Sequence, residues 1–403
     1  MFFGFDIKDN IPPKIYSISI YPLDENSFVN GKNKMQNFKV FNKNGLLKLG
    51  INKEIKVFGK IGFAVETNDF LNNSKNICGI YSIELKIKDE IIFLHQLDKI
   101  SFFQQKYINA HIDYSYKKRK RKILQKSFLL PNQKLFSYKK VKNKGVFYFD
   151  GDTIFNIKYT IKDSYENTST LKFNLKSFSN FRKIKDKKKK RIVKIMPFGR
   201  HNYFNEDDIK VSIPRGSLYD TLFFQYKKRD FNNYRYFSKV HFIHNEFTPL
   251  HKKMTISIKI TNFKNSLKDK YLIASVGNNG RLYSVGGKFK NGFITTKVRS
   301  FGKYVVVSDT EKPNIQALNI YENADMSLSK NIRFFINDNL SGIASYEVYI
   351  DGKWILFNYD KKINLIWHEF DKEKINFGRN HKLILKVKDK RNNIKILKLN
   401  FFK

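Results

Sequence analysis

The feature that most constrains this fold is a hairpin pattern that occurs twice in the chain. Residues 341–354 read SGIASYEVYIDGKW, an alternating apolar strand that ends in the two-residue turn Asp351-Gly352. Asp-Gly between alternating runs favours a type I′ hairpin, because both central residues of that turn need positive φ. The same pattern occurs at 78–95, CGIYSIELKIKDEIIFLH, with Lys88 to Glu90 at the turn. A hairpin that is used twice indicates a chain of β modules.

The alternation in the later hairpin predicts which of its side chains reach a core. Tyr346, Val348 and Ile350 share one face of the strand and should point inward, because side chains alternate between the two faces. Glu347 and Tyr349 should point outward. The return strand is expected to run from residue 353 to residue 359.

Two further matches flank the hairpins in the same order. Residues 9–15, DNIPPKI, and 309–315, DTEKPNI, each lead into a strand. Residues 156–175 and 382–400 each contain a strand that ends at Lys-Asp, a polar turn with asparagine and a return strand. Three matched elements in one order indicate duplicated modules.

The fold class expected from these patterns is all-β, with tandem immunoglobulin-like β-sandwich modules. Strand signals continue between the two matched copies, and helical periodicity is weak throughout. The expected domains are an immunoglobulin-like module at 9–177 with an inserted basic hairpin region at 99–151, a basic linker at 178–191, a β-sandwich module at 192–308 and a C-terminal immunoglobulin-like module at 309–403.

Charge is the second conspicuous property of the chain. Lys and Arg number 77 against 36 acidic residues, which gives a formal net charge of +41. Such an excess predicts contact with an anionic polymer, although AT-rich coding sequence also explains lysines spread over every segment. The first basic run has a simpler interpretation as a solvated hairpin tip. The candidate anionic-polymer contacts are Lys117, Lys118, Arg119, Lys120, Arg121, Lys122, Lys187, Lys188, Lys189, Lys190 and Arg191.

No residue pattern predicts a self-contained enzyme. His241, His244 and His251 are the densest histidine group, but residues three apart on a strand point to opposite faces and would not converge on a metal. Glu206-Asp207-Asp208 matches no calcium loop and favours a turn. A nucleophile elbow and a phosphate-binding glycine loop are both absent from the sequence. We therefore expect no catalytic, cofactor-binding or metal-ligating residue on this chain.

The sequence holds one cysteine, so an internal disulfide is excluded. It also lacks an apolar run of about 18 residues, and no transmembrane segment is expected. The first residues, MFFGFDIKDNIPP, have neither a basic n-region nor a long apolar segment. The localisation expected from these features is cytoplasmic if the chain is complete.

The order of several segments resembles a known family. Residues 9–15, 21–31 (YPLDENSFVNG), 60–70 (KIGFAVETNDF), 107–114 (YINAHIDY) and 284–306 resemble the non-catalytic region after the peptidase domain of long bacterial M23-type zinc endopeptidases. Those enzymes bind zinc through HxxxD and HxH motifs, and this sequence has neither. The resemblance implies that zinc belongs only to the absent peptidase domain.

The resemblance also implies a setting and partners. It places the chain at the cell envelope or in the periplasm, docking on a separately encoded M23 peptidase domain or on peptidoglycan. The two alternatives are a basic module that binds nucleic acid or another anionic polymer, which the evenly spread charge favours less, and a non-functional gene fragment.

Overall fold

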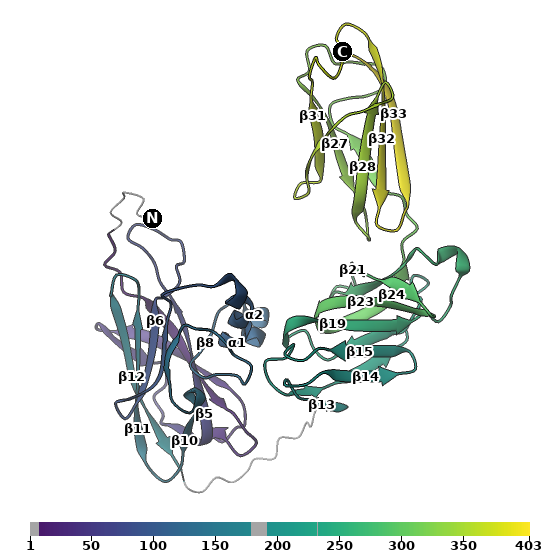
Figure 1. Ribbon diagram of the computed structural model, residues 1–403. Helices are drawn as coiled ribbons and strands as arrows, with labels where there is room; N and C mark the ends of the chain where they lie inside the picture. The colour runs from purple at the N-terminus through teal and green to yellow at the C-terminus, as the bar shows by residue number, and fades with distance from the viewer. Residues whose placement is uncertain (1–7, 179–191, 232) are drawn as a thin grey trace. The chain divides into compact units, whose positions relative to one another are not determined.

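The computed structural model describes residues 8–178, 192–231 and 233–403. The chain is all-β, built of tandem immunoglobulin-like β-sandwich modules (Figure 1). It packs as two compact units, the first formed by Met1–Asn202, Pro214–Gln225 and Glu246–Lys252, and the second by Tyr203–Ile213, Tyr226–Asn245 and Lys253–Lys403. Among the described residues, no helix is both long and apolar enough to cross a membrane.

The first module holds twelve strands in one continuous network of pairings. Their order is β10-β5-β1-β3-β4-β12-β11-β6-β7-β9, with the short β2 and β8 paired to β5. The strands are β1 (Lys14–Pro22), β2 (Phe28–Val29), β3 (Gln36–Lys43), β4 (Leu46–Leu49), β5 (Ile55–Asn68), β6 (Ser82–Ile87), β7 (Glu90–Gln96), β8 (Gln125–Lys126), β9 (Tyr138–Val141), β10 (Phe147–Phe149), β11 (Ile154–Lys162) and β12 (Thr168–Ser177).

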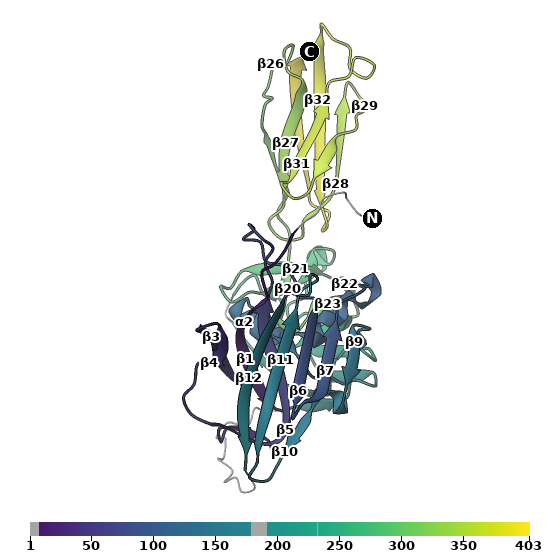
Figure 2. The ribbon, with the colours of Figure 1, turned by 90° about the vertical axis from the view of Figure 1, so that its left-hand side faces the viewer.

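The core of this module follows the two-residue alternation of its strands. In β11, Phe155, Ile157, Tyr159 and Ile161 are buried while their neighbours are exposed or half-buried. They join one hydrophobic cluster with residues of β1, β5, β6 and β12. Figure 2 shows β12, β11, β6 and β7 running side by side, as their pairings require.

The insertion predicted as a basic hairpin region contains short helices. They are the 3-10 helix η1 (Phe102–Tyr107), α1 (Ile108–His111) and α2 (Tyr114–Lys120), with a further 3-10 turn η2 (Asn143–Gly145). The interpretation of residues 117–122 as a hairpin tip is therefore wrong. Asp113 caps α2 by accepting a hydrogen bond from the Tyr116 amide at 2.8 Å. The basic residues of the last turn suit the negative end of the helix dipole.

The middle region, residues 192–308, folds into two five-stranded sheets and a small two-stranded sheet. The sheet orders are β14-β15-β19-β23-β22, β17-β18-β24-β20-β21 and β13-β16. The elements are β13 (Lys194–Met196), β14 (Asn202–Glu206), β15 (Ile209–Ile213), β16 (Leu222–Phe224), β17 (Tyr226–Arg229), β18 (Val240–Ile243), β19 (Pro249–Lys259), η3 (Asn265–Leu267), β20 (Tyr271–Val276), β21 (Leu282–Gly286), β22 (Lys288–Lys290), β23 (Phe293–Ser300) and β24 (Gly302–Ser308).

The C-terminal module is a sandwich of a four-stranded and a five-stranded sheet. Their orders are β25-β27-β31-β30 and β26-β33-β32-β28-β29, with one hydrophobic core between them. The strands are β25 (Asn314–Ala317), β26 (Ala324–Asp325), β27 (Asn331–Asn337), β28 (Ile343–Ile350), β29 (Lys353–Trp354), β30 (Asn358–Asp360), β31 (Leu365–Glu369), β32 (Asn380–Asp389) and β33 (Ile394–Phe402).

The later hairpin forms as the sequence predicts. Asp351 and Gly352 have φ of 52° and 79°, and Ile350 pairs with Lys353 across the turn. Val348 and Ile350 are buried, and Tyr346 packs against the same core. The return strand is shorter than expected, because the chain leaves β29 after Trp354 and joins the other sheet as β30.

The two outer modules place their matched elements in the same sheet positions. The first module has the order β12-β11-β6-β7, and the C-terminal module has the equivalent order β33-β32-β28-β29. In both, the strand of the hairpin pairs antiparallel with the strand that ends at Lys-Asp. The earlier hairpin also has two left-handed turn residues, Lys88 and Asp89, with φ of 49° and 62°. Sequence repeat and sheet position thus agree.

Candidate functional site

The first basic run, Lys117 to Lys122, covers the end of α2 and its cap. All six side chains are exposed, and Arg121 takes the left-handed conformation that ends the helix. Three of the six side chains contact described residues of the first unit, and the Nζ of Lys118 lies 5.8 Å from the centre of the Tyr114 ring. Arg119 lies over the Phe247 ring at 4.2 Å, and Lys122 forms an ion pair with Glu66 at 2.8 Å.

The partner of Lys122 is a buried carboxylate. Glu66 is 7% exposed and also accepts a hydrogen bond from the Ser17 hydroxyl at 2.8 Å. A buried carboxylate is costly unless it is paired, so Lys122 has a structural function. The remaining candidates in this run are free of such a buried partner and present their charge to solvent. The candidates Lys187 to Arg191 lie outside the described residues.

The histidine group of the middle region does not share one set of contacts. His241 is fully buried, and its Nδ1 lies 2.8 Å from the Tyr226 hydroxyl. The Nδ1 of His251 lies 3.1 Å from the Tyr219 hydroxyl. His244 Nε2 lies 2.9 Å from Asn245 Nδ2. Each imidazole therefore contacts a different neighbour, as expected for structural histidines.

The acidic turn of this region is also structural. Asp207 and Asp208 form the turn between β14 and β15. Lys228 lies 3.2 Å from a Glu206 carboxylate oxygen and 2.9 Å from an Asp208 carboxylate oxygen. Lys228 thus pairs with two of the three acidic residues. The acidic residues lie at a turn, as predicted from the sequence.

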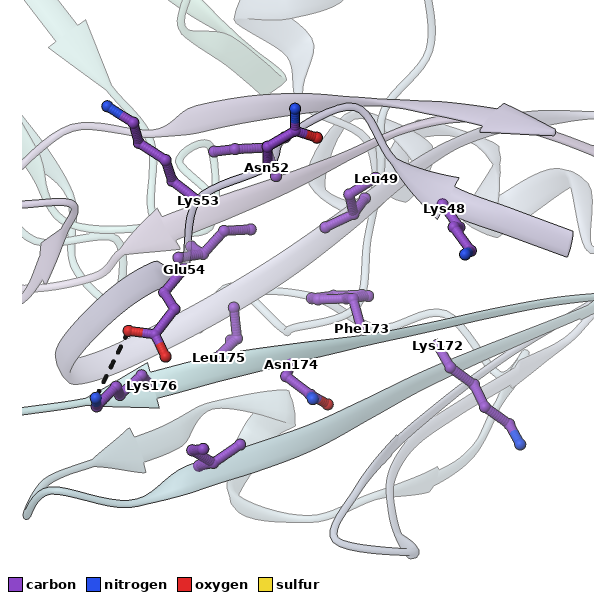
Figure 3. Close-up of a pocket in the computed structure, with 13 residues that line it drawn as sticks. Lys48, Leu49, Asn52, Lys53, Glu54, Lys172, Phe173, Asn174, Leu175 and Lys176 are labelled. Carbon is purple, nitrogen blue, oxygen red and sulfur yellow. Dashed lines mark ion pairs between the residues drawn. The ribbon is translucent and has the colours of Figure 1, made fainter. Parts of the chain in front are cut away.

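A groove on the first module lies between the end of β4, the segment that follows it and β12 (Figure 3). Its volume is about 430 Å³. Leu49 and Phe173 face each other across it, and Lys176 forms an ion pair with Glu54 at 3.6 Å. Its lining residues are Lys48, Leu49, Ile51, Asn52, Lys53, Glu54, Ile55, Ile154, Lys172, Phe173, Asn174, Leu175 and Lys176.

The groove exists because β12 changes partner along its length. β12 pairs in parallel with β4 only at Leu171, and with β5 from Leu175 onward. Between Leu171 and Leu175 this edge of β12 has no described pairing, and Phe173 is half-buried there. Four lysines and one glutamate line the groove, so its rim carries positive charge over an apolar floor.

A cluster of three aspartates lies at one end of the first module. Asp9 comes from the segment before β1, Asp69 follows β5, and Asp163 follows β11. One carboxylate oxygen from each lies within 4.8 Å of the others. Burial raises the pKa of Asp69, and the neighbouring charges of Asp163 and Asp9 raise it further. A hydrogen bond from the backbone of Phe70 lowers this pKa, but by less.

The C-terminal module carries an equivalent cluster, Asp309, Asp338 and Asp389. Asp309 precedes β25, Asp338 follows β27, and Asp389 ends β32. Their carboxylate oxygens also lie within 4.8 Å of one another. Burial raises the pKa of Asp309, and the negative charges of Asp338 and Asp389 raise it further. Hydrogen bonds from Ser341 act in the opposite direction and lower it. Two modules therefore hold three carboxylates each at the same structural positions.

Neither cluster was predicted from the sequence. Its matched segments already contained the signal, because Asp9 and Asp309 begin one matched pair and Asp163 and Asp389 end the strands of another. The third members follow an asparagine in each module, as Asn68-Asp69 and Asn337-Asp338. Aligning the two copies for shared aspartates would have found all six.

Comparison with known proteins gives one family match. The family model of the Zu5-like domain matches residues 193–309, the middle region. No curated protein matches the chain. Among solved structures, the fibronectin(III)-like modules of Clostridium thermocellum CbhA are 16% identical, with 38% of this chain and 85% of theirs covered and a TM-score of 0.18.

Two other solved structures are arrays of β modules. The central fibronectin-III array of RIM-binding protein is 9% identical, with 97% of this chain and 98% of that chain covered and a TM-score of 0.14. The EC3-6 structure of protocadherin gammaB7 is 11% identical, with 85% and 68% covered and a TM-score of 0.15. At TM-scores of 0.14 to 0.18 these likenesses carry no argument about what this chain does.

Proposed function

We propose that this chain is the non-catalytic β-sandwich portion of an M23-like peptidoglycan metallopeptidase, and that it docks on wall polymer at the cell envelope. The observation that carries the docking function is the lysine-rimmed groove between β4 and β12. The order of segments that resembles the M23-type proteins supports the setting. Zinc and peptide-bond hydrolysis stay with the peptidase half.

The chemistry of the groove suits peptidoglycan. The peptide stems of peptidoglycan carry carboxylates, and these are attracted by the ammonium groups of Lys48, Lys53 and Lys172 on the exposed rim of the groove. The half-buried side chains of Leu49 and Phe173 provide an apolar floor for the uncharged parts of the polymer. A site with an apolar floor and a few charged groups is typical of ligand grooves.

A pull-down tests this function. The purified chain, immobilised, is incubated with purified sacculi and, separately, with an M23 peptidase domain. Retention of sacculi supports docking on the wall. Retention of the peptidase domain alone would mean that the chain docks on that domain and not on the wall. Retention of neither contradicts the proposal.

A second candidate is binding of nucleic acid by the end of α2. The observation that favours it is the exposure of Lys117, Lys118, Lys120 and Arg121 around one helix terminus. Binding of this kind would weaken steeply as salt rises, because each neutralised phosphate releases counterions. A lack of retention on duplex and single-stranded DNA at low salt would eliminate it.

A further inference from the structure

We infer that each of the two aspartate clusters is a Ca²⁺ site, so that the chain binds two calcium ions, one at the same end of each outer module. The first site is formed by Asp9, Asp69 and Asp163. The second is formed by Asp309, Asp338 and Asp389. Both are independent of the groove and of the docking function.

The strongest observation is the state of Asp69. This residue is 4% exposed, and its Oδ1 is buried without a hydrogen-bond partner. Asp9 Oδ2 is buried and unpartnered as well. A buried carboxylate oxygen without a partner costs free energy, so two of them among three carboxylates within 4.8 Å point to a missing cation.

The third carboxylate of each cluster is held in place by its own turn. Asp163 Oδ1 accepts hydrogen bonds from the amides of Tyr165 and Asn167 at 2.8 and 2.9 Å, and its Oδ2 accepts one from Asn167 Nδ2 at 2.8 Å. The same Asn167 amide group donates to the carbonyl oxygen of Asp9 at 3.1 Å. One asparagine therefore fixes two of the three ligand residues.

The second module repeats this arrangement. Asp389 Oδ1 accepts from the amides of Arg391 and Asn393 at 2.7 and 2.9 Å. Asn393 Nδ2 donates to Asp389 Oδ2 at 2.6 Å and to the Asp309 carbonyl at 3.0 Å. Asp338 Oδ1 is buried without a partner, like Asp69 Oδ1. The agreement of two copies makes an accidental cluster of acidic side chains a poor explanation.

These carboxylates have no direct ion-pair partner in the part of the chain that the structure describes. Within the described ranges, no lysine or arginine forms an ion pair with any of the six aspartates. Arg391 lies near the second cluster, where its guanidinium donates to the Gly287 carbonyl at 3.0 Å. The equivalent position in the first module is Tyr165, which carries no charge at neutral pH.

The donor set selects the metal. Three carboxylates provide oxygen ligands alone, which hard cations prefer. Ca²⁺ holds oxygens at about 2.3–2.6 Å in a flexible geometry, and carboxylate oxygens within 4.8 Å of one another can all reach one such ion. Mg²⁺ requires a near-ideal octahedron and gives up its water reluctantly, so a site formed by three protein carboxylates favours Ca²⁺. Water molecules complete the coordination.

The ion would join three segments that are distant in sequence. In each module it links the segment before the first strand, the end of a strand in one sheet and the Lys-Asp turn of the other sheet. Calcium therefore fixes the leading segment to its own sandwich. We expect the first site to bind more tightly, because Arg391 adds positive charge beside the second.

Calorimetric titration of the metal-depleted full-length chain with CaCl2 tests the inference. The expected stoichiometry is two Ca²⁺ per chain, with at least tenfold weaker binding of Mg²⁺. Asp69→Asn and Asp338→Asn should each leave one site, and the matched exposed change Asp207→Asn should leave two. A stoichiometry of two that survives both Asn substitutions contradicts the assignment, as does a lack of saturable binding at millimolar Ca²⁺.

A stability measurement separates loss of binding from loss of folding. In EDTA the two Asn variants should melt at the same temperature as the unchanged chain or higher, because each removes one repelling charge. Added Ca²⁺ should raise the melting temperature of the unchanged chain more than that of either variant. If Ca²⁺ stabilises all three equally, the clusters are not the sites.

Discussion

Asn393 Nδ2 donates a hydrogen bond to Asp389 Oδ2 at 2.6 Å, and the same amide group donates to the carbonyl oxygen of Asp309. Asn393 is 7% exposed, so water cannot replace these bonds without opening the structure. It ties the turn after β32 to the segment before β25. Asn167 has the same function in the first module.

Asn393→Ala should destabilise the C-terminal module by about 1–3 kcal/mol, because Asp389 Oδ2 and the Asp309 carbonyl oxygen each lose the donor that Asn393 Nδ2 provides. Hydrogen exchange at the amides of β32 and β33 measures this loss locally. The control is Asn358→Ala at an exposed position of β30, which should change stability by no more than about 0.5 kcal/mol. Equal protection in both variants would show that the bridge contributes nothing.

Lys122 should contribute to stability, in contrast to its neighbours in the basic run. Lys122→Ala leaves the buried carboxylate of Glu66 with the hydroxyls of Ser17 and Tyr116 but without a cation, and should cost about 1–3 kcal/mol. Lys120→Ala removes an exposed charge and should change little. Thermal unfolding of the two variants measures the difference in stability. Identical melting temperatures would show that the Lys122–Glu66 ion pair does not stabilise the fold.

Two stacked histidines should make the first module sensitive to acid. The rings of His95 and His111 lie 4.6 Å apart and both are buried. Burial lowers the pKa of His95 to about 4. Burial and the neighbouring His95 lower the pKa of His111 to about 3; Lys126 adds to the lowering, and the hydrogen bond that His111 Nε2 donates to Gln125 Oε1 opposes it.

Proton linkage determines how the stability of the first module changes with pH. An unfolded histidine has a pKa of about 6.5, so below that pH the unfolded chain binds protons that the folded chain excludes. Stability is therefore full above about pH 6.5 and falls as the pH drops toward 4, by about 1.4 kcal/mol per pH unit for each histidine. Denaturant unfolding at pH 7.5 and 5.0 measures the loss. His95→Leu should reduce the loss of stability between pH 7.5 and 5.0, and the control His201→Leu, at an exposed position, should leave that loss unchanged. If His95→Leu loses as much stability as the unchanged chain, the buried histidines are not its cause.

Asp351 should make the opposite kind of contribution in the C-terminal hairpin. Burial opposes its ionisation, but hydrogen bonds from the Lys382 amide, Arg379 and His381 outweigh burial and lower its pKa to about 2. A lowered carboxyl pKa stabilises the fold above about pH 4, and the stabilisation disappears as the pH falls toward 2. Asp351→Asn keeps a residue that tolerates positive φ but removes the charge.

We expect Asp351→Asn to unfold more easily than the unchanged chain at pH 7, and the difference to narrow at pH 2.5. Chemical denaturation at the two pH values is the appropriate measurement. A difference of the same size at both would mean that the charge of Asp351 is not the stabilising feature.

Local patterns made the duplicated strands predictable. The turns at 88–89 and 351–352 are formed by adjacent residues, and the alternation of β28 shows its buried face directly in the sequence. The pairs β11–β12 and β32–β33 also agree with the matched segments. In each of these cases the determining residues are neighbours in the chain.

Features that depend on distant residues were not predictable in the same way. Lys122 meets Glu66 across more than fifty residues, and each aspartate cluster collects three segments of its module. The helix α2 was not predicted either, because the run KKRKRK at 117–122 has no apolar periodicity, although Asp113 caps the helix. The groove depends on the change of partner along β12, which no local pattern records.

The most direct test of the account is quantitative co-sedimentation of the full-length chain with purified sacculi. Charge reversal in the groove, Lys48→Glu with Lys172→Glu, should reduce the bound fraction at least tenfold. The matched reversal on the basic helix, Lys117→Glu with Lys118→Glu, should leave most of it bound, although both variants lose the same charge. Equal losses in the two variants, or no binding by the unchanged chain, would contradict the groove as the docking site.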